Sequence, residues 1–209
     1  MTRLLHVEAS PRSEASYSSE VAREFIDAYR RKYPTARIQT LNVWSEELPA
    51  FDQSMVSAKM AMMSGAQHTP QEAQAWAKVR KVFDQFADAD HYLISTPMWN
   101  FGLPYKLKQL IDLVTQPGLA FGFEPSRGFF GLLTERKVFC VFSSSLDYSP
   151  GTAFVSSDHL RPHLETLLSF MGIESMGFVQ AAPTFGEPTA VAQAIENSKR
   201  KARQIASQF

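Results

Sequence analysis

Residues 4–19 read LLHVEASPRSEASYSS, in which a short apolar run gives way to a segment dense in serine. Residues 3–8 predict a buried strand, and residues 18–33 predict a helix because Val21, Phe25 and Tyr29 recur at helical spacing. A polar loop between a strand and a helix is a natural place to hold an anion, although an ordinary polar turn has the same composition. The loop after this strand is therefore the first candidate site.

The rest of the chain continues the alternation of strands and helices. Strands are predicted at residues 37–43, 91–95, 136–142 and 175–180, and helices at 54–64, 69–87, 104–116, 158–171 and from 188 nearly to the end. Residues 119–133, rich in Gly and Phe, predict a hairpin-like excursion. Together these elements predict a single α/β domain over residues 1–209, with a doubly wound five-stranded parallel sheet and helices on both faces.

Composition and charge exclude several classes of protein. The 209 residues carry 21 basic and 21 acidic side chains, so the net charge is zero, and no basic run suggests a nucleic-acid partner. No apolar run reaches the roughly 18 residues that a membrane-spanning helix needs, and the first residues lack a signal-peptide pattern. The single cysteine, Cys140, excludes an internal disulfide and favours the reducing cytoplasm. We expect no metal site, because the candidate pair His159 and His163 has Pro162 between its members and no adjacent Glu.

Three of the predicted strands end in loops of unusual composition. The first is followed by SPRSEASYS, the third by TPMWNFGLP and the fourth by SSSLDYSPGT. In a sheet with the order 2-1-3-4-5 these strands are neighbours, and ligands bind at their carboxyl ends. We therefore expect the three loops to converge on one crevice.

The first loop offers a phosphate site. Hydroxyl groups of Ser10, Ser16 and Ser18 would join the free N–H groups of the following helix, and Arg12 would add a charge-assisted contact. The alternative is that Ser16 or Ser18 merely caps the helix. The patterns G-x-x-x-x-G-K-[ST] and G-x-G-x-x-G are both absent, so a terminal phosphate on a mononucleotide such as FMN fits better than a pyrophosphate.

The second loop offers a wall for a flat ring. Met98, Trp99 and Phe101 would cover an isoalloxazine face, and Asn100 with nearby backbone groups would bond the polar edge of the ring. The alternative is a hydrophobic loop tucked under its own helix.

The chain resembles the FMN-dependent NADH-azoreductase family, which consists of flavodoxin-like, homodimeric quinone and azo-dye reductases. The resemblance spans nearly the whole chain and rests on Ser10–Arg12 with Ser16–Ser18, Pro97–Phe101, Leu107-Lys108-x-x-Ile111-Asp112 with Gly118 and Phe121, and Phe170–Ile173. It implies that the phosphate of bound FMN contacts Ser10, Arg12, Ser16, Tyr17 and Ser18, and that the flavin ring contacts Pro97, Met98, Trp99, Asn100 and Phe101.

The loop after the fourth predicted strand departs from that family. The family usually has Ser-Arg-Gly-Gly where this chain has Ser143, Ser144, Ser145 and Leu146. We expect the three serines to contact the cofactor. The contact should differ from that of the family, because glycine allows a closer backbone approach and positive φ.

The resemblance also implies the reaction. NADH or NADPH would pass a hydride through FMN to a quinone or an azo compound in ping-pong order, with no catalytic side chain. Phe121 and Phe123, with Phe154 of the partner subunit, would wall the substrate cavity, unless these rings only pack at the homodimer interface. A rival interpretation is a non-catalytic FMN-binding regulator or electron carrier, although electron carriers tend to be strongly acidic.

Overall fold

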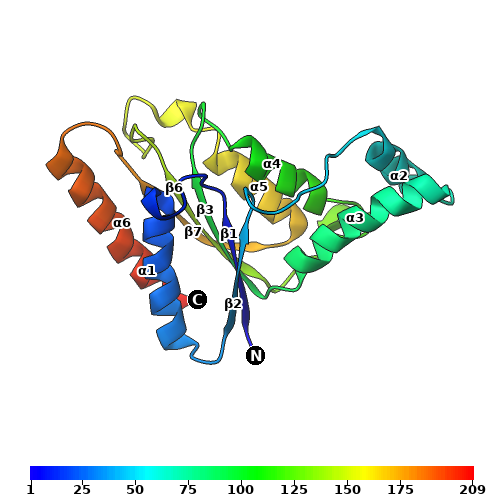
Figure 1. The fold of residues 1–209 in the computed structure, drawn as a ribbon, viewed down its shortest axis with the longest axis horizontal. Coiled ribbons are helices and arrows are strands. Elements are labelled where there is room, and N and C mark those ends of the chain that lie inside the picture. Colours follow the sequence, from blue (N-terminus) through cyan, green and yellow to red (C-terminus); the bar gives the residue numbers. More distant parts are fainter.

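A computed structural model describes residues 1–209, apart from the side chain of Met176. Strands and helices alternate along the chain (Figure 1). The strands are β1 (Arg3–Glu8), β2 (Arg37–Asn42), β3 (His91–Pro97), β4 (Phe121–Glu124), β5 (Gly128–Gly131), β6 (Lys137–Ser143) and β7 (Glu174–Ala181). The helices are α1 (Tyr17–Lys32), α2 (Gln53–Met63), α3 (Pro70–Ala87), α4 (Tyr105–Val114), α5 (Arg161–Met171) and α6 (Pro188–Gln208).

The central sheet is parallel and has the order β2-β1-β3-β6-β7. This is the predicted order 2-1-3-4-5, because β6 and β7 are the fourth and fifth strands of that sheet. The remaining two strands, β4 and β5, form a separate antiparallel hairpin, which confirms the excursion expected for residues 119–133. The doubly wound architecture predicted from the alternating pattern is confirmed.

Each face of the sheet is covered by helices and buries its own core. Helices α1 and α6 lie on one face, and α3, α4 and α5 lie on the other (Figure 1). Consecutive residues of β3 alternate between the two cores, with Tyr92 and Ile94 on the α3–α5 side and Leu93 packed with Phe25 of α1. Burial on both faces explains why the central strands are almost continuously apolar.

Side-chain caps set the helix boundaries. Thr69 and Glu72 form the expected capping box at the start of α3. Helix α5 begins at Arg161 and not at Asp158 as predicted, because the Asp158 carboxylate accepts hydrogen bonds from the N–H groups of Leu160 and Arg161 (2.9 and 3.0 Å). Short 3₁₀ turns at Ser13–Ala15 and Val155–Ser157 have no periodic signal in the sequence.

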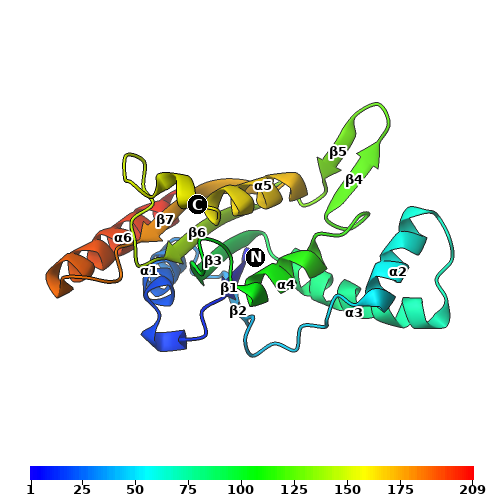
Figure 2. The same ribbon diagram turned by 90° about the horizontal axis from the view of Figure 1, so that it is seen from above.

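The β4–β5 hairpin projects from the C-terminal end of α5 (Figure 2). The N–H of Leu133 donates to the carbonyl of Met171, the last residue of that helix (2.9 Å). A Cβ atom on Gly131 would lie 2.2 Å from the backbone N of Gly172, so this close approach requires glycine. The hairpin is thereby fixed near the start of β7, at the edge of the sheet opposite to the strands' carboxyl ends.

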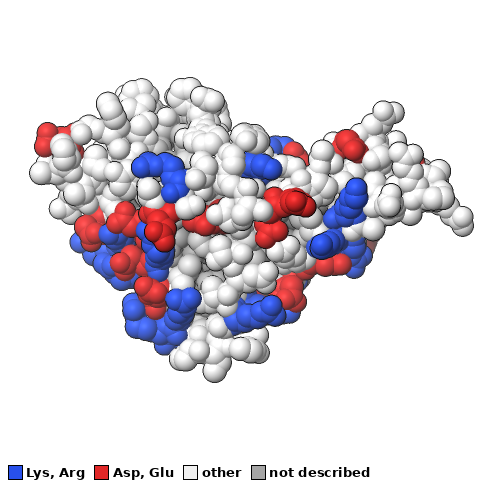
Figure 3. Space-filling view, viewed as in Figure 1, with Lys and Arg blue, Asp and Glu red and all other residues white. Residues whose placement is uncertain are grey.

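The surface has no large region of a single charge on the face shown in Figure 3, where basic and acidic residues intermingle. The upper edge of that view, above the carboxyl ends of the strands, is mostly uncharged. Among the described residues, no helix is both long and apolar enough to span a bilayer.

A buried histidine links stability to pH. His6 lies inside β1, with its Nε2 atom 2.8 Å from Ser95 Oγ. Burial lowers the pKa of His6 from 6.5 to about 4. The charge of Glu8 opposes this shift and that of Arg23 adds to it. The unfolded chain therefore binds a proton that the folded chain rejects. The contribution of neutral His6 to the free energy of unfolding is fully present above about pH 6.5. It is lost between about pH 6.5 and 4, by about 3 kcal/mol in total.

We predict that His6→Gln removes this part of the pH dependence. Urea unfolding at pH 7 and at pH 5 should show a larger loss of unfolding free energy in the natural protein than in the variant. Parallel pH profiles for the two proteins would contradict the prediction, whatever the offset between them.

Candidate functional site

The three loops identified in the sequence meet at one edge of the sheet. In the register of the strands, Glu8 is opposite Ser95 and Pro97 is opposite Ser143. Beyond these pairs, the N–H of Ala9 donates to the carbonyl of Ser95, and the N–H of Met98 donates to that of Ser143, both at 2.8 Å. The convergence predicted from the strand order is therefore confirmed.

The serines of the first loop are gathered at the N-terminus of α1. Ser10, Ser16 and Ser18 are 2%, 3% and 0% exposed, and the hydroxyl oxygens of Ser16 and Ser18 lie 3.0 Å apart. Ser16 is indeed the N-cap of the helix, but its Oγ accepts from the N–H of Ser19 at a long 3.4 Å. The cap and an anion site are compatible, because one long bond leaves most of the donors of the first turn to a ligand.

Charged groups of both signs surround this loop, with Glu14 within it and Glu20 in the first turn of α1. Arg12 is exposed, and its guanidinium carbon lies 6.0 Å from the centre of the Tyr17 ring. The acid that ends β1, Glu8, is held by two other side chains: Ser19 Oγ donates to Glu8 Oε1 (2.7 Å) and Asn42 Nδ2 donates to Glu8 Oε2 (3.0 Å). These bonds direct the Glu8 carboxylate toward Ser19 and Asn42.

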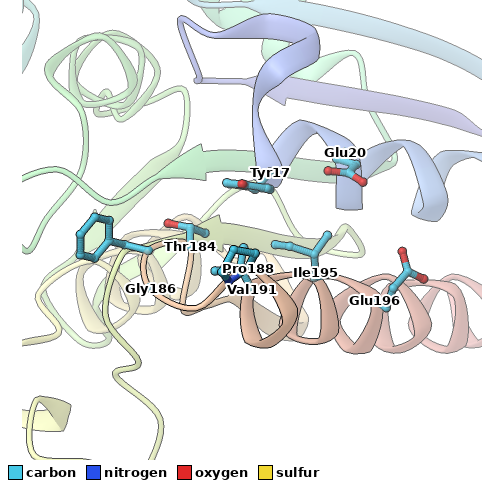
Figure 4. Close-up of a pocket in the computed structure, with 10 residues that line it drawn as sticks. Tyr17, Glu20, Thr184, Gly186, Pro188, Val191, Ile195 and Glu196 are labelled. Carbon is cyan, nitrogen blue, oxygen red and sulfur yellow. The ribbon is translucent and has the colours of Figure 1, made fainter.

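A separate cavity of about 480 Å³ lies between the first turns of α1 and α6 (Figure 4). Glu20 and Glu196 line it, and Lys199 Nζ bonds both carboxylates, at 2.6 and 2.7 Å. Two carboxylates and one ammonium group leave a net negative charge, which disfavours a phosphate. Among the described residues, Tyr17 is the link between this cavity and the first loop, so the cavity is distinct from the edge where the three loops meet.

The second loop is a tight turn with left-handed backbone. Asn100 and Phe101 have φ of 47° and 67°, and the flanking residues Trp99 and Gly102 exchange two backbone hydrogen bonds (3.0 and 2.9 Å). Asn is favoured at positive φ, whereas Phe is not. The turn therefore stores strain at Phe101, and backbone bonds from both sides hold it in place.

An aromatic cluster borders this turn, and the sequence reasoning missed part of it. The rings of Trp44 and Trp99 have centroids 5.6 Å apart, and Trp44 meets Tyr105 edge-on at 5.3 Å. The indole N–H of Trp44 donates to the carbonyl of Ala9 (3.0 Å), which ties this ring to the first loop. Trp44 follows β2, which is the neighbour of β1 in the predicted strand order. That position could have indicated that Trp44 lies beside the first loop. The aromatic wall is wider than residues 98–101 alone.

The third loop is held to β7. Ser143 and Ser144 are buried and Ser145 is exposed. Ser144 Oγ donates to the carbonyl of Leu146 and accepts from Gln180 Nε2, both at 2.8 Å. The hydroxyl of Ser144 is thus engaged within the protein, and Gln180 is a contributor that the sequence reasoning did not identify. A lone Gln in a strand gives no signal before its partner is known.

The expected substrate residues are not brought together within one chain. Phe121 packs on Phe170 near the end of α5 (4.6 Å between ring centroids), and Phe123 is exposed on the same hairpin. Phe154 lies before the start of α5, beside Tyr148 (6.4 Å). Helix α5, whose 11 residues span about 16 Å, lies between the two groups in the chain. Among the described residues, no group of three or more His, Cys, Asp or Glu side chains could hold a metal ion.

The strain at Phe101 gives a direct test of the turn. We predict that Phe101→Gly is more stable than Phe101→Ala by about 1 kcal/mol, because only glycine adopts positive φ without cost. At an ordinary extended or helical position the order would be reversed. Urea unfolding of the two variants measures the difference, and a more stable alanine variant would show that the turn is not left-handed.

Comparisons with known proteins agree over the whole chain. The family model described as flavodoxin-like fold matches residues 2–206. The chain is 38% identical to a protein named FMN-dependent NADH:quinone oxidoreductase from Desulfotalea psychrophila, over all of this chain and 98% of that protein. It is 37% identical over the full length of both chains to FMN-dependent NADH:quinone oxidoreductase 1 from Bradyrhizobium diazoefficiens.

Solved structures give the same result. An azoreductase from Bacillus anthracis superimposes over the whole of both chains with a TM-score of 0.87 and 26% identity. An FMN-dependent NADH-azoreductase from the Ames Ancestor strain of that species, solved in complex with FMN, gives a TM-score of 0.86 at 24% identity over 100% of this chain and 99% of that one, and supports the fold. The chain therefore belongs to the flavodoxin-like fold family and, within it, to the same family as the curated FMN-dependent NADH:quinone oxidoreductases.

Proposed function

We propose that this protein is an FMN-dependent oxidoreductase that passes a hydride from NADH through FMN to quinones and azo compounds. The observation that carries the proposal is the meeting of a buried serine cluster and an exposed aromatic turn along one edge of the sheet. The full-length relatives named FMN-dependent NADH:quinone oxidoreductase support the same chemistry here, and the azoreductase neighbours support azo compounds as acceptors.

The first loop would hold the phosphate of FMN. Ser10, Ser16 and Ser18 present hydroxyl groups beside the positive end of a 16-residue helix, which matches a dianionic phosphomonoester. Arg12 is exposed beside them and would add a charge-assisted bond, and Tyr17 would contact the phosphate through its backbone N–H. The loop has no closely spaced glycines to admit a second phosphate, so a mononucleotide fits better than a dinucleotide.

The second loop would hold the ring. Trp99 and Phe101 are 38% and 49% exposed, and with Met98 they offer apolar surface at the rim. The N–H groups of Asn100 and Phe101 take no part in the two hydrogen bonds that close the turn, so they would be left to bond the polar edge of the ring. Bound FMN would supply the hydride chemistry, and these residues would bind and orient the flavin. Pro97 at the end of β3 and Ser143–Ser145 at the end of β6 would line the site beside them.

A homodimer would complete the substrate cavity. Phe121 and Phe123 lie at one end of α5 and Phe154 at the other, so one cavity can be lined by both groups only if two chains contribute. Exposed Phe123, Phe129 and Leu132 give the hairpin an apolar surface for such a contact. We also propose a cytoplasmic location, since the single cysteine, Cys140, is a buried free thiol; cell fractionation tests this.

We predict that the purified protein takes up one FMN per chain and shows the absorbance of oxidised flavin. NADH added without oxygen should bleach that absorbance, and benzoquinone should restore it. Sedimentation of the same sample should give twice the mass of one chain.

Two controls separate the alternatives. A protein that binds FMN but is not reduced by NADH would be the non-catalytic carrier or regulator, and one that takes up no FMN would overturn the assignment altogether. The double variant Asn100→Ala with Trp99→Ala should keep its circular dichroism and lose FMN affinity or turnover.

A further inference from the structure

A set of side-chain hydrogen bonds from Gln180 of β7, which we call the clamp, holds the third loop. Ser145 and Leu146 follow Ser144 after β6, and within residues 143–148 the described backbone has no positive φ. In this first part of the loop no glycine conformation is used, and the left-handed Gly151 lies further along (φ 91°). Side-chain hydrogen bonds from β7 fix its path.

The Gln180 side chain bonds three residues in the first part of this loop. Its Nε2 donates to Ser144 Oγ (2.8 Å) and to the carbonyl of Leu146 (3.0 Å), and its Oε1 accepts from the N–H of Tyr148 (3.3 Å). Both amide hydrogens and one oxygen lone pair are thereby used. The reverse orientation of the amide would put Oε1 against the Leu146 carbonyl, so the network admits one orientation.

Backbone bonds hold Gln180 and Ser144 in turn. The Gln180 carbonyl lies 3.1 Å from Ser198 Oγ of α6, whose single hydrogen is shared with the carbonyl of Ala194 (2.9 Å). The N–H of Ser144 donates to the carbonyl of Ala181 (3.3 Å), and the carbonyl of Ser144 accepts from the N–H of Thr184 (3.0 Å). The clamp is therefore bonded to β7 and to the segment that follows it.

The clamped loop supports the turn that faces the proposed flavin ring. The carbonyl of Ser143 accepts from the N–H of Met98 (2.8 Å), just before the turn. At the far end of the same loop, the N–H of His159 donates to the carbonyl of Phe101 (3.0 Å). The turn is thus bonded at Met98 to the start of this segment and at Phe101 to its far end, and Gln180 bonds the residues that follow Ser143.

We infer that Gln180 is a positioning residue of the flavin site, which sets the third loop against the cofactor and steadies the Met98–Phe101 turn through Ser143. This inference rests on the proposed FMN function.

Gln180→Met tests the inference in the FMN-loaded protein, with Gln193→Met as the matched control. Gln193 bonds only Asn197 on the exposed side of α6 in the described structure (3.0 Å). We expect Gln180→Met to raise the FMN Kd about tenfold and to change the visible flavin spectrum. Hydrogen exchange of the amides in residues 144–148 should quicken, and the control should match the natural protein in all three measurements.

Further variants keep the outcome decisive. If urea titrations show that Gln180→Met folds poorly, Gln180→Glu replaces it in the test. Gln180→Glu keeps the acceptor for the N–H of Tyr148 and loses the donor to Ser144 and Leu146, so we expect it to weaken FMN binding as well. Ser144→Ala combined with Gln180→Met should add little to the effect of Gln180→Met alone, because both act on one network.

The experiment distinguishes failure of this inference from failure of the proposed function. If the natural protein binds FMN and the Gln180 variants keep its Kd and spectrum, even with faster exchange in the loop, Gln180 has only a folding role and the inference fails. If the natural protein binds no FMN, the proposed function itself fails.

Discussion

The adjacency of β1, β3 and β6 in a parallel sheet is the constraint on which the rest of the site depends. Because these strands run in the same direction and in register, the residues that follow each of them emerge at one edge. A serine-rich segment and an aromatic segment more than eighty residues apart thereby become neighbours. Neither segment is a site alone: the first would be a helix cap, and the second would be an apolar turn.

The site combines rigid support with local strain. Phe101 occupies a conformation that a bulky residue rarely adopts, and it is bonded through its carbonyl to His159. Such strain persists only where the surroundings over-determine the backbone. Here the surroundings are the loop clamped by Gln180 and the aromatic contacts among Trp44, Trp99 and Tyr105. The packing of the sheet and its two cores thereby offsets the cost of the positive φ at Phe101, which the isolated turn would not adopt.

Periodicity was sufficient to predict most of the fold. The apolar spacing in α1, the capping box at Thr69 and the alternation of strands with helices gave the elements and their order, because local propensity and burial agree there. The first and second loops could be located by their composition at strand ends. The positive φ of Phe101, the bonds of Gln180 and the distance of the hairpin from Phe154 could not be predicted. Each of these depends on contacts between residues distant in sequence, for which a single chain offers no pattern.

A crystal structure of the FMN complex tests the central claim most directly. The account predicts that the phosphate oxygens lie within hydrogen-bonding distance of the Ser16 and Ser18 hydroxyl groups, with the ring against Met98–Phe101. A phosphate bound instead in the cavity between α1 and α6, or a ring on the opposite edge of the sheet, would contradict it.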